Sequence, residues 1–142
     1  MNHKIEIEVE LIVHATEDVT KILQSFEEIL NIKEDEFTVK ETTGHYENPI
    51  KILKAKIVKK QAQELMKVLA STLSSDQVNK LIEEIEERTI DSRLHMRLDK
   101  QDLINGNLKI TEKEPIKFKI YTPVYNKKDT LKSFTEVFQV VN

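Results

Sequence analysis

The stretch 4-KIEIEVELIV-13 decides the fold, because its residues alternate between charged and apolar types. Charged side chains occupy one face of an extended chain here: Lys4, Glu6, Glu8 and Glu10. Aliphatic side chains occupy the other: Ile5, Ile7, Val9, Leu11 and Val13. A period of two residues is typical of a strand with one buried face.

The same alternation predicts further strands at residues 37–43, 50–58, 93–98, 108–111 and 116–121. In the strand at 50–58 the alternation slips at Ile52-Leu53, which predicts a β-bulge. Apolar residues at helical spacing predict helices at residues 19–30, 62–69, 78–85 and 131–138.

Residues with capping chemistry mark the helix ends. The predicted N-caps are Thr16, Ser74, Asp99 and Asp129, and Ser74 also forms a capping box with Gln77. Asp99 opens a short helical turn, which Gly106 closes in the left-handed C-terminal position.

Clean alternation in nearly every strand indicates a sheet that is covered on one face only, which is typical of antiparallel pairing. The predicted order is β-α-β-β-α-α-β-β-β-α. The expected fold class is α+β, a mainly antiparallel sheet with helices packed on one face in a two-layer sandwich. The length of 142 residues predicts a single domain over residues 1–142.

Composition narrows the function classes. The chain has no cysteine, two glycines and no apolar run of membrane-spanning length, and it opens without a signal peptide, so we expect a cytoplasmic protein. Abundant Lys, Glu and Ile are typical of a thermophile. The net charge of −3 is unevenly divided. Residues 1–50 hold 4 lysines against 12 acids, whereas residues 51–142 hold 18 Lys and Arg against 13 acids.

The uncovered sheet face is predicted to carry many charges. Its cations and its aromatic residue are Lys54, Lys56, Arg93, His95, Arg97, Lys117, Lys119 and Tyr121, and they lie beside the acids Glu6, Glu8 and Glu10. One interpretation is a platform for a phosphate backbone, and the alternative is a solvated face whose opposite charges pair across strands. Because Tyr121 is the one aromatic residue on this face, phosphate contact is favoured over base readout.

The connection 44-GHYENPI-50 is first interpreted as a link between two strands. Gly44 is expected to end a strand with positive φ, and Pro49 holds Asn48 extended. His45, Tyr46 and Asn48 are secondary candidates for ligand contact.

No pattern of catalytic residues is present in the sequence. The four histidines show no metal-binding spacing, and two glycines do not suffice for a phosphate-binding loop or a dinucleotide fingerprint. We therefore expect no enzyme, no metal site and no cofactor. A hydrolase that acts through scattered carboxylates is the least favoured alternative.

Three stretches together resemble a known family: 14-HATED-18, 44-GHYENPI-50, and 97-RLDKQ-101 followed by Gly106. They are similar to the archaeal RNA-binding proteins described as predicted exosome subunits, whose fold is similar to the ribosomal protein that binds 5S rRNA. The resemblance implies RNA binding, in an accessory role in RNA processing or with ribosomal RNA, and it implies no catalytic residue. If the contacts are to phosphates, we expect the binding to be sensitive to salt. Where the family tends to have Gly before Asn-Pro, this chain has Glu47.

The predicted RNA contacts combine these observations. They are Lys54, Lys56, Arg93, Arg97, Lys100, Lys117, Lys119, His45, Tyr46 and Asn48. We expect Glu6, Glu8 and Glu10 to pair with neighbouring lysines and to leave Arg93, Arg97 and Lys100 for RNA. The alternative is a protein-interaction subunit of an RNA-processing complex, with the acidic segment Glu83–Glu87 as its docking surface.

Overall fold

The computed structural model describes residues 5–44, 46–112, 115–122 and 127–139. Its six strands are β1 (Glu6–His14), β2 (Phe37–Thr43), β3 (Pro49–Val58), β4 (Thr89–Ile90), β5 (Arg93–Asp99) and β6 (Pro115–Tyr121). They form one sheet in the order β2-β3-β1-β6-β5-β4, and every neighbouring pair is antiparallel.

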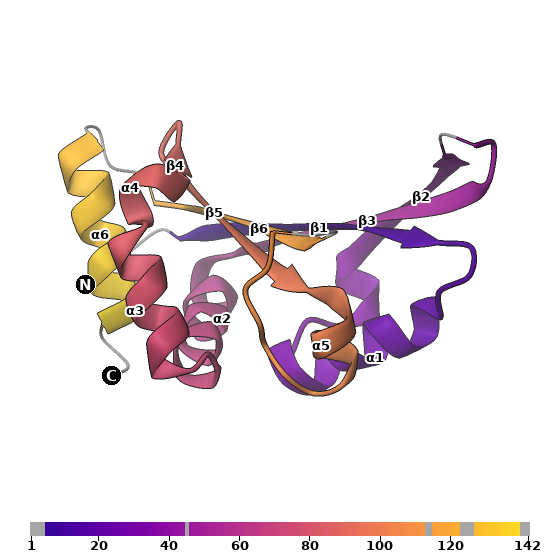
Figure 1. Ribbon diagram of the computed structural model, residues 1–142, viewed down its shortest axis with the longest axis horizontal. Coiled ribbons are helices and arrows are strands. Elements are labelled where there is room, and N and C mark those ends of the chain that lie inside the picture. The colour runs from indigo at the N-terminus through magenta and orange to yellow at the C-terminus, as the bar shows by residue number, and fades with distance from the viewer. Residues whose placement is uncertain (1–4, 45, 113–114, 123–126, 140–142) are drawn as a thin grey trace.

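The helices are α1 (Val19–Leu30), α2 (Lys59–Thr72), α3 (Ser75–Glu83), α4 (Ile85–Arg88), α5 (Lys100–Ile104) and α6 (Lys127–Gln139), with a 3-10 turn η1 (Glu34–Glu36). Figure 1 shows α1, α2, α3 and α5 on the same side of the sheet. This confirms the predicted α+β class and the single covered face. No helix within the described ranges is both long enough and apolar enough to cross a bilayer.

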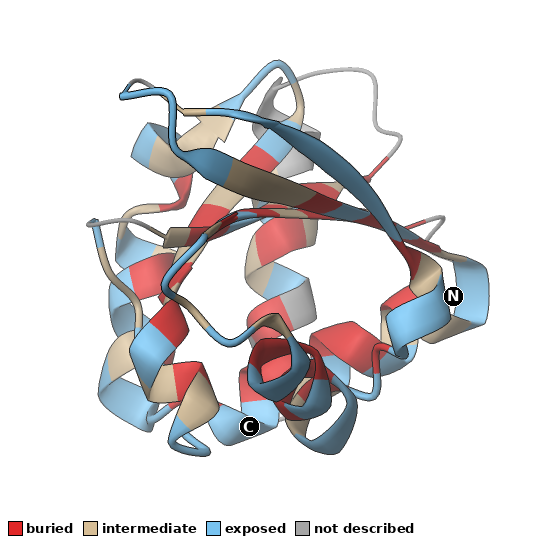
Figure 2. Ribbon diagram, turned by 90° about the vertical axis from the view of Figure 1, so that its right-hand side faces the viewer, coloured by how far each residue is buried: buried red, intermediate tan, exposed pale blue. Residues whose placement is uncertain are grey.

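The core lies between the sheet and the helices, where Figure 2 shows the buried segments in red. Alternate residues of β1, from Ile7 to Val13, are almost completely buried, and so are Leu53, Phe118 and their neighbours on the same face. Each buried aliphatic or aromatic side chain contributes about 1.5–3 kcal/mol by leaving water. This face of the sheet therefore fixes which residues of every strand point outward.

The predicted bulge in β3 is wrong. The register between β1 and β3 runs without a break from the pair Glu6↔Val58 to the pair His14↔Ile50. Leu53 is buried, and Ile52 faces outward as the direct partner of Ile12. The slip in alternation therefore marks apolar residues on the open face, not an extra residue in the strand.

Two predicted caps are correct and two are wrong. Ser74 and Asp99 cap α3 and α5, and Gly106 has the expected left-handed φ of 88°. Helix α1, however, is capped by Asp18 rather than Thr16, and α6 begins at Lys127, so Asp129 lies within its first turn.

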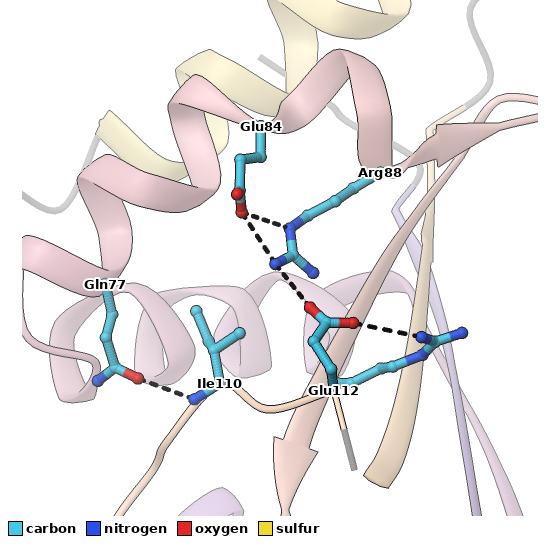
Figure 3. Close-up of polar contacts among 6 residues, drawn as sticks. Gln77, Glu84, Arg88, Ile110 and Glu112 are labelled. Carbon is cyan, nitrogen blue, oxygen red and sulfur yellow. Dashed lines mark hydrogen bonds and ion pairs between the residues drawn. The ribbon is translucent and has the colours of Figure 1, made fainter.

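Gln77 does not complete the predicted capping box. Its side-chain nitrogen donates to the carbonyl oxygen of Leu108 (3.2 Å), and its side-chain oxygen accepts from the N–H of Ile110 (2.8 Å). Figure 3 shows the second of these bonds. The side chain of Gln77 thus ties α3 to the segment that was predicted as a strand at residues 108–111.

That segment forms a single bridge, Leu98↔Ile110, rather than a strand. It lies along the outer edge of β5, where the N–H of Thr111 donates to the Arg97 carbonyl (3.0 Å) and the N–H of Asp99 to the Lys109 carbonyl (2.8 Å). Strand β4, which was not predicted, covers the other end of the same edge. Asp91 and Ser92 join β4 to β5 with φ of 52° and 64°, as a two-residue type I′ hairpin requires.

Candidate nucleic-acid interface

The strand register sets the candidate residues in rows across the open face. One row runs Lys54, Glu10, Lys117 and Arg97, and the next runs Lys56, Glu8, Lys119 and His95. A third row holds Glu6, Tyr121 and Arg93. The alternation in the sequence thus placed these side chains on the same face, and the register makes them neighbours.

Two of the three acids on β1 pair with lysines of β3. Lys54 Nζ lies 3.9 Å from a carboxylate oxygen of Glu10, and Lys56 Nζ lies 3.8 Å from one of Glu6. This confirms the expected pairing for Glu6 and Glu10. Exposed pairs of this kind contribute about 0–1 kcal/mol, so a phosphate can replace either carboxylate at little cost.

Lys117 and Lys119 of β6 differ from the β3 lysines. Neither lies within ion-pair distance of an acid among the described residues. Both line a hollow of about 470 Å³ on the open face, together with Lys54, Lys56, Glu8 and Glu10. The middle of the sheet therefore presents four lysines around one depression, which Glu8, Glu10 and Glu36 also line.

The lowered pKa of His95 indicates a positive electrostatic potential at this part of the open face. Burial lowers the pKa of the imidazole, and the positive charges of Lys119, Arg97, Arg93 and Lys117 lower it further. Four cations thus lie close enough to disfavour a fifth charge. The same positive field attracts anions.

Arg93 packs against the ring of Tyr121, with its guanidinium carbon 5.1 Å from the ring centroid. One guanidinium nitrogen also donates to the carbonyl oxygen of Asp91 (3.3 Å). The ring and the carbonyl fix the orientation of Arg93 at the edge of the open face.

Arg97 has a carboxylate partner that the sequence did not indicate. Its guanidinium lies 3.5 Å from Glu112, whose other carboxylate oxygen lies 3.3 Å from Arg88. Arg88 in turn pairs with Glu84 at 2.9 Å (Figure 3). Arg97 is therefore paired within the protein, as Lys54 and Lys56 are.

Lys100, which the sequence predicted as an RNA contact, has its charge engaged within the protein. It is 8% exposed, and its ammonium donates to the carbonyl oxygen of Ile12 (2.7 Å) and to Glu17 (2.8 Å). Burial alone raises the pKa of Glu17, but the hydrogen bonds from Lys100 and from the His14 N–H outweigh it and lower that pKa. Lys100 is a structural cation that joins α5 to the end of β1.

A sequence profile described as RNA binding matches residues 6–122, which is most of the chain. This protein belongs to that RNA-binding family.

Archaeal relatives cover most of the chain. A protein of Methanocaldococcus jannaschii, described as uncharacterised, is 34% identical over 137 residues, 89% of this chain and 91% of that protein. A protein of Pyrococcus abyssi that is named an RNA-binding protein is 32% identical over 116 residues, 78% of this chain and 75% of that protein. The crystal structure of a DUF54 protein from Archaeoglobus fulgidus has a TM-score of 0.81 at 25% identity and covers 95% of this chain and 99% of that one.

The three stretches that carry the family resemblance meet at one end of the sheet. The Lys100–Glu17 pair joins the stretch 97–101 to the stretch 14–18. A hollow of about 240 Å³ is lined by His14 and Glu17 together with Pro49 and Ile50. The residues that carry the resemblance thus build the end of β1 and its surroundings.

In the connection 44–50, positive φ falls on Glu47 (59°) and not on Gly44, which corrects the expectation for Gly44. A side chain on Gly44 would meet the side-chain oxygen of Asn48 at 3.1 Å, so close approach explains this glycine. Tyr46 is 86% exposed and Asn48 is exposed, whereas His45 lies outside the described residues.

Proposed function

We propose that the protein binds RNA through phosphate contacts on the open face of its sheet, as an accessory in RNA processing by the exosome or with ribosomal RNA. One observation carries the site assignment. Lys117 and Lys119 project from the middle of an uncovered face, without an acid in ion-pair range among the described residues, into a hollow shared with Lys54 and Lys56. Membership of the RNA-binding family supports RNA as the polyanion.

Phosphates rather than paired base edges fit this central region. Its side chains are ammonium and guanidinium groups on β3, β5 and β6, and Tyr121 is already packed against Arg93. Cations that neutralise phosphates bind without reading sequence and release counterions, so their affinity falls as salt rises. A net charge of −3 argues against binding through the whole protein surface.

The role in exosome-linked processing or with ribosomal RNA rests on the family resemblance. The alternative, a protein-interaction subunit that docks a basic partner on the acidic segment Glu83–Glu87, is weakened by the geometry. Glu84 already holds Arg88, so part of that negative charge is neutralised within the protein.

The test is a titration of a mixed-sequence single-stranded RNA against wild type and Lys117→Gln/Lys119→Gln at several salt concentrations. We expect weaker binding by the variant and a slope of log affinity against log salt that is shallower by about 1.4, at about 0.7 for each lost phosphate contact. The matched control is Lys67→Gln/Lys80→Gln, which removes two exposed lysines from α2 and α3. Equal slopes for the two double variants would refute the site.

A pull-down from an archaeal lysate, with and without ribonuclease, tests the accessory role. Recovery of exosome subunits or ribosomal components with the wild type, and their loss with Lys117→Gln/Lys119→Gln, is expected. Recovery that is independent of both the lysines and the RNA would favour the protein-interaction subunit instead.

A further inference from the structure

The open face is not charged throughout. Ile12 and Ile52 face outward as direct cross-strand partners, and Ile50 lies in the next row, opposite His14. Because the register of β1 and β3 is unbroken, no bulge accounts for these residues. Two strands therefore break their alternation at the same place on the side of the sheet that faces solvent.

Pro115 extends this group on the other side of β1. A hollow of about 240 Å³ is lined by Ile12 and Pro115 together with Glu10, His14, Lys100 and Lys117. Ile12 is 42% exposed, and Ile50, Ile52 and Pro115 are partly exposed. These four residues, Ile12, Ile50, Ile52 and Pro115, are referred to below as the apolar patch.

Cations border the apolar patch. Lys54 and Lys117 occupy the adjoining row, and Lys40 of β2 is the direct partner of Ile52. The acid nearest in that row, Glu10, is engaged with Lys54. A molecule bound at the patch thus contacts an apolar surface that has positive charge on two sides.

We propose that the apolar patch receives the bases of unpaired nucleotides while their phosphates lie on Lys54, Lys117 and Lys40. An unpaired nucleotide joins a flat, largely apolar base to an anionic phosphate. This surface is complementary to it, because it places apolar side chains next to lysines. The inference rests on the proposed RNA binding and specifies its substrate class. The substrate is single-stranded or looped RNA, since the bases of a duplex are stacked and do not reach the patch.

A protein partner fits this surface less well. Four partly exposed side chains present only a fraction of the roughly 800 Å² that each partner buries in a stable protein–protein interface. The lysines beside the patch also continue directly into the proposed phosphate surface, so one RNA strand can occupy both.

The test compares Ile12→Thr/Ile52→Thr with wild type for a single-stranded RNA and for a duplex of the same length. Threonine keeps the strand propensity but removes apolar surface. We expect about tenfold weaker binding of the single strand, from the loss of a few contacting methyl and methylene groups. The salt slope and the duplex affinity stay unchanged, because the lysines remain. Val39→Thr is the matched control, since Val39 is exposed on the other face of the hairpin.

Each outcome has a distinct meaning. If wild type shows no salt-dependent RNA binding, the proposed function itself fails. If wild type binds and the double variant matches it, or loses single strand and duplex equally, only the apolar patch is refuted, and a protein partner becomes the better occupant.

Ile12→Tyr gives an independent test that does not depend on the folding of the double variant. It enlarges the apolar floor at an exposed strand position and adds a ring for stacking. Tighter binding of the single strand supports the proposal, and weaker or unchanged binding overturns it.

Discussion

The two faces of β6 show how differently one strand is constrained on its two sides. Ile116, Phe118 and Ile120 are fully buried, whereas Lys117, Lys119 and Tyr121 point to the uncovered face. The buried set is fixed by the free energy of removing apolar surface from water. The exposed set contributes little to folding, so its chemistry is less constrained by the core.

The largest effect is expected on the buried face. Phe118→Ala lowers the free energy of unfolding by about 3–5 kcal/mol, because it leaves a cavity in the core. Lys119→Ala, one residue away, changes it by less than about 0.5 kcal/mol. Urea denaturation measures both, and similar losses for the two variants would contradict the contrast between the faces.

Lys100 differs from the lysines of the open face, because it is a mostly buried cation that contributes to stability. Lys100→Met lowers the free energy of unfolding by about 2 kcal/mol through the loss of charged hydrogen bonds, and it leaves RNA affinity unchanged. Weaker RNA binding by a fully folded variant would support Lys100 as an RNA contact.

The same ion pair gives stability a pH dependence. The pKa of Glu17 is lower in the folded protein than its usual value. Its contribution is therefore complete at neutral pH and is lost as the pH falls through the folded pKa. Urea denaturation of Glu17→Gln should show a smaller loss of stability between neutral and acidic pH than wild type, and equal losses would exclude this assignment.

The ion pair between Glu112 and Arg97 is expected to weaken RNA binding by the open face. Glu112→Gln removes the carboxylate shared by Arg88 and Arg97 and makes Arg97 available to phosphate, so RNA binds about two- to fivefold more tightly. Filter binding at constant salt measures this. Unchanged affinity would place Arg97 outside the RNA contacts.

The smallest effect concerns His95, whose pKa is lowered by burial and by four neighbouring cations. Bound phosphates offset those charges and raise this pKa, so RNA binding takes up a proton and tightens as the pH falls through the imidazole range. A change of about two- to threefold is expected for a single half-buried charge, and His95→Gln abolishes it. Chemical shifts of His95 that titrate identically with and without RNA would contradict this coupling.

The sequence predicted the fold well where alternation and burial agree, as in β1, β5 and β6. The prediction of a bulge at Ile52 was wrong, because the alternation pattern assumes that every apolar residue of a strand faces the core. The sequence missed the pairing of Lys100 for a different reason. The carboxylate of Glu17 lies 83 positions away in the chain, and no local pattern reports a contact of that range. Glu112, 15 positions from Arg97, was missed for the same reason.

The two edges of the sheet, at β2 and at β5 with β4, differ in how far their backbone groups are paired, and this affects self-association. β4 and residues 109–111 engage the two ends of the outer edge of β5. β2 pairs only with β3 in the described sheet. An unpaired edge strand can pair with a strand from another molecule, and charged side chains oppose such pairing. Lys40 and Glu41 lie in the middle of β2 and are exposed. Partial cover on one edge of the sheet and charged side chains on the other both oppose uncontrolled polymerisation.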